Sequence, residues 1–349
     1  MHGFEWQDQR GVEGTGFVRA LRSLLTSHLQ DFQPHLERLV KDFLEIEFKD
    51  IHSNGNLKSI TDSCEHDFHQ SQLLCLLWRG TLYETQPLDT FRWDREMANA
   101  LEFPQAVILA AEFIRITPGF MRPLVASIAT NRHRAAKTLY QHLVPIVEQR
   151  LAVKDLQPHG VTPMDCMQWL IDTSPRKNPW TPARMVGEIM AVWFGSVHQL
   201  AMVVTCRRKA LASYTFQDGS AISRGDWVCI PQQAMLQDGT RYKDAHVFDG
   251  FRFARANAQL QQRRPCAEVP DQQASRLTHA SPDWPIWGLG NMSCPGRFYA
   301  SLVIKLILIR ILSDWECQMP HPEAPRTKTW RSSMVPRDDT IVMFRKKLP

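Results

Sequence analysis

Residues Trp287 to Gly296 read WGLGNMSCPG, and they carry the strongest structural signal in this sequence. This stretch is a glycine-punctuated loop led by an aromatic residue, and it delivers Cys294 to the start of an apolar helix. A thiolate at a helix N-terminus is stabilised by the helix dipole and by free backbone N–H donors, which lower its pKa. Gly290 and Gly296 have no Cβ, so the backbone can turn sharply and approach a flat ligand closely. The loop therefore predicts a thiolate that serves as a ligand.

This loop resembles the haem-binding signature of the cytochrome P-450 family, aromatic-x-x-Gly-x-x-x-Cys-x-Gly. Trp287 stands where Phe is usual. The resemblance implies haem b as the cofactor, with its iron axially bound by Cys294. Such a thiolate pushes electron density onto iron and favours cleavage of the dioxygen bond. The alternative for a lone cysteine is a buried structural thiol before a core helix.

Two arginines outside the loop also resemble cofactor-binding positions of the family. The segment Phe248 to Phe253, FDGFRF, resembles the family's meander, in which the arginine, here Arg252, braces the haem pocket by pairing with a Glu-x-x-Arg on a preceding helix. Arg208 stands where an arginine that binds a haem propionate is common. For each arginine the alternative is a solvated surface charge.

The chain departs from the family's pattern at several of these points. The family carries two further helices, one with the Glu-x-x-Arg, where this chain passes directly from Thr205 to Cys206. Without that partner, Arg252 is expected to be costly if buried, or to turn to solvent. Asn291 and Met292 occupy positions where the family often has an Arg or His that holds a propionate. Glu112-x-x-Arg115 has the right spacing, but it lies on an earlier helix and is interpreted as a coincidence.

A long apolar helix is predicted from Thr181 to Thr205, with Thr181 and Pro182 as its cap and first-turn pair. It is expected to be buried, because it is apolar on nearly all sides. In the family this helix crosses the distal face of the haem and carries an acid or amide followed by Thr. His198 and Gln199 stand at those positions. The resemblance implies that His198 relays protons and that Gln199 orders a water molecule. A hydrogen-bonded core histidine is the alternative for His198.

Hydrophobic periodicity predicts a mainly α-helical chain with a small β-sheet, and the resemblance implies an incomplete cytochrome P-450-like fold. We expect a single domain over residues 1–349, without the N-terminal anchor and the first part of the fold. The pattern also predicts a strand pair at the C-terminus, 329–333 with 340–344. Other helices are predicted over 16–48 (two helices), 97–115, 126–150, 164–171 and 294–312, and other strands at 214–216, 222 and 227–230. Turns are predicted at 217–219 and 224–225.

Residues 52–95 lack periodicity, and their structure is doubtful. They include a metal-like group whose spacing fits no standard zinc module. A translation out of frame or a retained intron is the alternative origin of this segment. The group consists of Cys64, His66, His69 and Cys75.

Composition restricts the partners. The formal charge of +5 is not concentrated in a basic block interleaved with aromatic residues, which argues against nucleic-acid binding. A mildly basic surface suits an acidic redox partner. The eight cysteines form no Cys-x-x-Cys pair, which favours a reducing compartment. No apolar run reaches the ~20 residues needed to span a bilayer, so the chain is expected to lack an anchor.

The resemblance, which extends to ascomycete members of the family, implies a haem-thiolate monooxygenase. It would oxidise an apolar small molecule in a fungal secondary-metabolite pathway, with electrons from a flavoprotein reductase. Full-length relatives sit on the cytoplasmic face of the endoplasmic reticulum membrane, whereas a chain without an anchor would be cytoplasmic. Two alternatives remain: a catalytically inactive product, truncated or mis-spliced, and a haem-binding or scaffold protein without turnover.

Overall fold

A computed structural model of the chain describes residues 16–48, 58–59, 102–103, 106–107, 109–114, 116–156, 163, 165–197, 206–270, 275–290, 293–330, 333–337 and 340–347. They group into two compact units. Unit 1 contains the described parts of 1–201, 302–326 and 336–349, and unit 2 contains those of 202–301 and 327–335. The expectation of a single domain stays a prediction.

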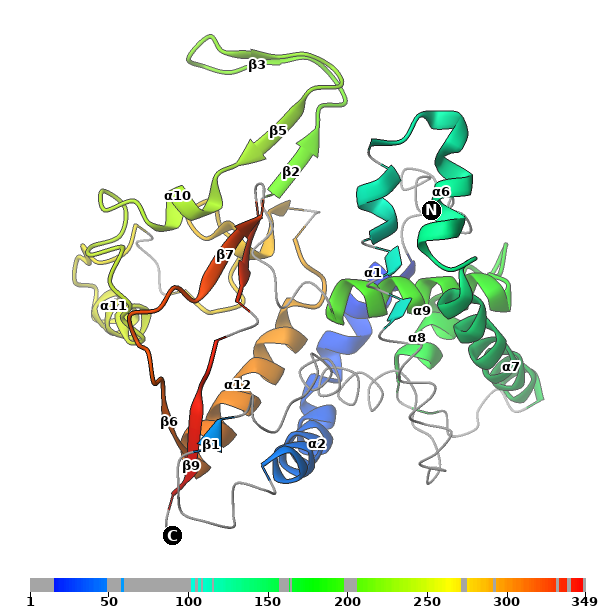
Figure 1. Ribbon diagram of the computed structural model, residues 1–349, viewed down its shortest axis with the longest axis horizontal. Helices are drawn as coiled ribbons and strands as arrows, with labels where there is room; N and C mark the ends of the chain where they lie inside the picture. The colour runs from blue at the N-terminus through cyan, green and yellow to red at the C-terminus, as the bar shows by residue number, and fades with distance from the viewer. Residues whose placement is uncertain are drawn as a thin grey trace. The chain divides into compact units, whose positions relative to one another are not determined.

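Unit 1 is mainly helical, and α7, α8 and α9 pack side by side in it (Figure 1). Residues 185–190 of α9 are buried without interruption, as predicted for a helix that is apolar on nearly all sides. The helices of unit 1 are α1 (Gly16–Arg19), the π-helix η2 (Ala20–Leu25), α2 (Leu29–Glu47), the 3-10 helix η4 (Gly119–Met121), α6 (Arg122–Ala129), α7 (Arg134–Leu156), α8 (Cys166–Thr173), α9 (Pro182–Val197) and most of α12 (Arg297–Asp314).

The starts of α8 and α9 follow from side-chain capping. Thr181 Oγ1 accepts the N–H of Arg184 at 3.2 Å, which confirms the predicted cap of α9. Asp165 Oδ1 accepts the N–H of Gln168 at 2.9 Å and begins α8. The same buried carboxylate accepts two bonds from the guanidinium of Arg150, at 2.6 and 2.8 Å, which join α7 to α8.

The prediction of one helix over 126–150 is wrong, because this segment contains the end of α6 and most of α7. Three consecutive residues between them, Asn131 to His133, have φ angles of 48°, 55° and 60°. These values lie in the left-handed region, which cannot continue a right-handed helix. Thr130 Oγ1 donates back to the carbonyl of Ala126 at 2.7 Å and closes the last turn of α6.

The predicted C-terminal strand pair, 329–333 with 340–344, is also wrong. Strand β9 (Met343–Lys346) pairs instead with β6 (Trp315–Gln318) and β1 (Lys58–Ser59), in the order β1-β9-β6. The ring of Phe48 lies 4.5 Å from that of Trp315 and 5.0 Å from that of Phe344, and all three are buried. Burial of these rings explains why β9 pairs with distant strands rather than with its neighbour in sequence.

Unit 2 contains short strands and helices around a small core of its own. The sharp turns predicted around 217–219 and 224–225 are present, with φ angles of 83° at Gly219 and 97° at Gly225. The core consists of Tyr242, Ala256, Cys266 and Val269. Its elements are the pair β2 (Cys206–Lys209) and β5 (Trp227–Ile230), the pair β3 (Tyr214–Thr215) and β4 (Ala221–Ile222), α10 (Gln232–Leu236), α11 (Arg252–Gln261), the 3-10 helix η6 (Pro285–Trp287), the start of α12, and β7 (Thr327–Trp330), which pairs with β8 (Ser333–Pro336).

The predicted fold class, mainly α with a small β component, is confirmed. Helix α12 begins at Arg297, three residues later than predicted. Within the described part of the chain, none of the helices has both the length and the apolar character needed to span a membrane.

One buried thiol in unit 1 gives a prediction on stability. Burial, together with the charges of Asp165 and Glu188, raises the pKa of the Cys166 thiol. In the unfolded chain a thiol ionises above about pH 8.5. The folded chain then binds more protons than the unfolded chain, so the free energy of unfolding falls as the pH rises through this range.

Cys166→Ala is expected to remove a slope of up to about 1.4 kcal/mol per pH unit above about pH 8.5. Urea unfolding of the variant and the parent chain at several alkaline pH values measures the difference. Cys229→Ala removes an exposed thiol and should keep the parent slope. Equal slopes in the Cys166 variant and the parent would contradict the prediction.

Candidate functional site

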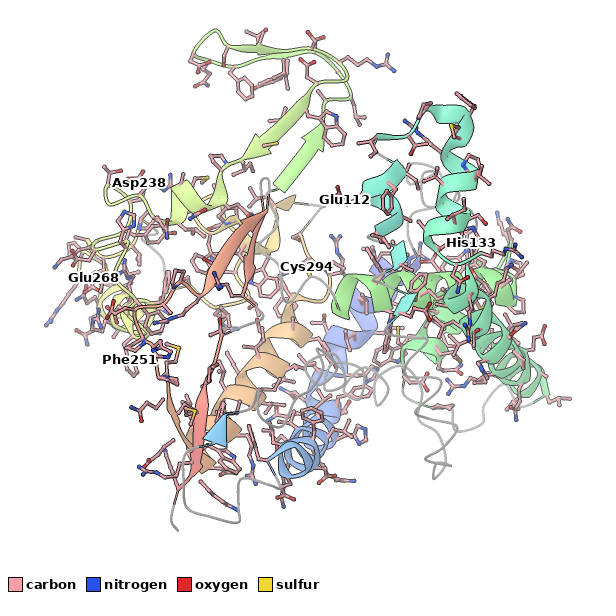
Figure 2. All side chains as sticks on the ribbon, viewed as in Figure 1. Glu112, His133, Asp238, Phe251, Glu268 and Cys294 are labelled. Atoms are coloured by element: carbon pink, nitrogen blue, oxygen red, sulfur yellow. The ribbon has the colours of Figure 1, made fainter. Side chains whose placement is uncertain are left out.

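The cysteine loop, residues 287–297, begins in η6 and ends at the start of α12, in unit 2. Figure 2 labels Cys294 of this loop. Cys294 is joined to the first residue of the loop by a backbone hydrogen bond of 2.6 Å from its N–H to the carbonyl of Trp287. Gly288 and Gly290 have φ angles of 73° and 57°, a region that residues with a Cβ rarely adopt. The sharp turn predicted at Gly290 is therefore present, and Gly288 makes a second one.

The Cys294 thiol is partly buried and lies three residues before the first residue of α12, Arg297, rather than at the start of the helix as predicted. The backbone N–H groups of Gly296 and Arg297, together with the charge of Arg297, act to lower the pKa of this thiol. Burial is the larger effect, however, and it raises the pKa. The prediction of a lowered pKa was therefore wrong in sign. The thiol has to release its proton when it becomes a metal ligand.

The loop leaves space beside its backbone. A Cβ added at Gly290 or at Gly296 would meet no heavy atom within 4 Å. Gly290 is therefore explained by its positive φ angle, whereas neither a φ angle nor a crowded neighbour explains Gly296. The open side of the loop is compatible with the predicted approach of a flat ligand.

The donors at the loop also fit haem. No group of three His, Cys, Asp or Glu side chains that could hold a metal ion occurs among the described residues. Cys294 offers one soft sulfur donor, and a cysteine thiolate is one of the protein ligands that haem iron takes.

Two side chains tie the loop to the segment 275–278. Trp287 donates from Nε1 to the carbonyl of Leu277 at 2.6 Å. Arg297 donates from Nε to the carbonyl of Thr278 and from Nη1 to the carbonyl of Cys294, both at 3.1 Å. Trp287 was predicted as a site residue, but Arg297 was missed. The one available signal for Arg297 was its position three residues after the cysteine.

Arg252, at the start of α11, is buried. Its guanidinium donates to the carbonyls of Lys243, of Asp244 at 2.8 Å and of Val247 at 3.1 Å. The sequence offered two outcomes for an Arg252 without the Glu-x-x-Arg, a costly burial or a turn to solvent. Burial is the outcome, and main-chain carbonyls take the place of a carboxylate. Figure 2 shows the adjacent Phe251 well apart from Cys294, and the bracing role of Arg252 stays a prediction.

Several other predicted site residues lie outside the described structure. His198 and Gln199 follow the described end of α9, so their catalytic roles stay predictions. Arg208 belongs to β2, where its backbone pairs with Val228, but its side chain is not among those described. Other positions raised by the sequence also fall outside the described residues, namely Cys64, His66, His69, Cys75, Arg115, Asn291 and Met292.

Comparison with known proteins finds similarity to cytochrome P450 proteins. The family model described as "Cytochrome P450" matches residues 200–344. The chain is 22% identical to cytochrome P450 monooxygenase olcJ of Penicillium canescens, over 96% of this chain and 71% of that protein. It is also 22% identical to cytochrome P450 monooxygenase 103 of Postia placenta and to penP of Penicillium crustosum. Those alignments cover 70% and 74% of this chain, but only 59% and 60% of the relatives.

Solved structures agree in fold. The heme domain of cytochrome P450DA superposes with a TM-score of 0.65 at 12% identity, covering 97% of this chain and 79% of that domain. The retinoic acid-bound cyanobacterial CYP120A1 gives a TM-score of 0.59 at 16% identity, covering 94% of this chain and 75% of its own. At these identities the likeness shows the fold alone.

Proposed function

Since the chain belongs to the fungal cytochrome P450 family, we propose that it is a haem-thiolate monooxygenase in which Cys294 binds the iron of haem b. The observation that carries the proposal is the position of the Cys294 thiol. It lies three residues before α12, where the backbone N–H groups of Gly296 and Arg297 act to lower its pKa. Charge on that sulfur is stabilised there by the backbone donors and by the helix dipole.

The residues of the chain have separate parts in this proposal. Haem, when bound, supplies the iron that activates dioxygen. Cys294 gives up its thiol proton and presents sulfur to the metal, and the N–H groups of Gly296 and Arg297 offset the charge. Gly290 and Gly296 keep the loop clear of the ligand. Arg208 holds a propionate, and Arg252 keeps the meander folded.

The proposed roles on the distal side of the haem, the substrate and the redox partner are those that the family implies. His198 relays protons there, and Gln199 orders a water molecule. The substrate is an apolar small molecule of a fungal secondary-metabolite pathway, and a flavoprotein reductase supplies the electrons. Full-length relatives would carry out this chemistry on the cytoplasmic face of the endoplasmic reticulum membrane.

A second candidate is a family member without activity. It is favoured by the direct passage from Thr205 to Cys206, which leaves no Glu-x-x-Arg helix before the strand β2. Such a product would keep the cysteine loop, but it would not hold haem productively.

One spectrum separates the two candidates. The full chain is expressed with haem available, purified, reduced under carbon monoxide and examined in the Soret region. A red-shifted band of the thiolate type is expected if Cys294 binds iron. A histidine-type band would reduce the proposal to haem binding without a thiolate ligand. Colourless protein would remove the catalytic assignment and favour the second candidate.

A further inference from the structure

The cysteine loop is fixed at both ends to two consecutive carbonyls. Trp287, at the start of the loop, donates to Leu277 O at 2.6 Å, and Arg297, at its end, donates to Thr278 O at 3.1 Å. The second bond of Arg297, to Cys294 O, joins the same guanidinium to the cysteine itself. Its carbon lies 4.4 Å from the centre of the Phe298 ring, which restricts the guanidinium further.

The segment that carries these two carbonyls is anchored in turn. Asn257 of α11 donates from Nδ2 to Ser275 O at 2.7 Å, and its Oδ1 accepts the N–H of Ser275 at 2.9 Å. Hydrogen bonds therefore connect α11 to the segment 275–278, and this segment to the two ends of the cysteine loop. We call this set the brace. Its members are Asn257, Ser275, Leu277, Thr278, Trp287 and Arg297.

We propose that Trp287 and Arg297 are positioning residues that hold Cys294 in ligand geometry through the brace, and that Trp287 does so by its indole N–H. The haem part of this inference rests on the proposed function. Phenylalanine, the usual residue of the family at this position, has no N–H and cannot make the bond to Leu277. Trp287 is therefore a feature of this chain rather than a neutral replacement.

The loop needs such a brace because of its backbone. Gly288 and Gly290 adopt conformations that glycine reaches easily, but glycine also leaves them easily, since it has the largest backbone freedom of any residue. A ligand to a metal has to be held within about 0.5 Å of its productive position by surrounding bonds. A tie at each end of the loop restricts both sides of the cysteine.

The test replaces the indole by the ring that the family uses. In Trp287→Phe without haem, hydrogen exchange of the loop amides is expected to be about three- to tenfold faster, as for the loss of one hydrogen bond. With haem, a smaller share of the reduced carbon monoxide complex should give the thiolate-type band. Trp284→Phe is the matched control, because it makes the same atomic change at an indole that contacts Phe253 in the same unit. It should leave both measurements unchanged.

Arg297→Lys tests the other end of the brace and serves if the tryptophan variant does not fold. Lysine keeps the charge, but it cannot donate to Thr278 and Cys294 with the fixed fork of a guanidinium. Faster loop exchange and a smaller thiolate-type share are expected again. Parent-like loop exchange in both variants, or equal effects in Trp284→Phe, would overturn the proposal. If the parent chain gives no thiolate-type band, the proposed function is wrong. Hydrogen exchange of the loop amides without haem still tests whether the brace holds the loop.

Discussion

Cys294→Ala is expected to abolish the thiolate-type band of the reduced carbon monoxide complex completely. An alanine side chain has no donor atom that can bind iron. The measurement is the Soret spectrum of the purified variant beside that of the parent chain. This is the largest effect we predict, because it removes the one sulfur on which the site depends.

The controls for this experiment are the exposed thiols. Cys229→Ala and Cys317→Ala remove the same atoms at solvent-exposed positions, and both should keep the parent band. Urea unfolding of the haem-free proteins should show that Cys294→Ala folds about as well as the parent, because its side chain is only partly buried. A thiolate-type band that survives in Cys294→Ala would show that another cysteine binds the iron.

Arg252→Ala is expected to lower the free energy of unfolding by about 2 kcal/mol. The change removes a buried guanidinium with its donors to three main-chain carbonyls, and hydrogen bonds that involve a charged group are stronger than neutral ones. The carbonyls belong to exposed residues and can bind water in the variant, which keeps the loss well below the sum of three bonds.

Urea unfolding followed by circular dichroism measures this change. Arg264→Ala is the control, because it removes an exposed arginine from the same unit and should change stability by no more than about 0.5 kcal/mol. Arg252→Lys should fall between the two, since an ammonium group cannot reach three carbonyls with fixed geometry. Equal stability of Arg252→Ala and the parent would show that the three bonds contribute nothing net.

The hydrogen-bond acceptors of Arg252 could not be predicted from the sequence. The sequence lacks the Glu-x-x-Arg, and this absence indicated that a buried Arg252 would need other hydrogen-bond acceptors for its guanidinium. The answer lies in the backbone path of residues 243–247, which turns three carbonyls toward one guanidinium. Nothing in the side chains of Lys243, Asp244 or Val247 indicates that path, because main-chain acceptors are the same in every residue.

The direction of the pKa shift of the Cys294 thiol was also predicted incorrectly. The position of this thiol before an apolar helix predicted N–H donors and a favourable dipole, and the donors are present. The sign of the pKa shift depended on burial, which is a property of the folded surroundings rather than of the loop sequence. The helical break at 131–133 and the pairing of β9 were also decided by distant packing or by backbone angles that hydrophobic periodicity does not report.

Several local features of the protein follow from neighbouring residues in the sequence. These are the cap of α9 at Thr181, the glycine turns, the apolar helices and the placement of Cys294 shortly before a helix, because each depends on neighbouring residues and their spacing. Two other features depend on how the whole chain folds: the carbonyls to which Trp287, Arg297 and Arg252 donate, and the strands with which β9 pairs. Those contacts link residues across loops and between elements, and their partners are fixed by the path of the folded backbone rather than by residue type.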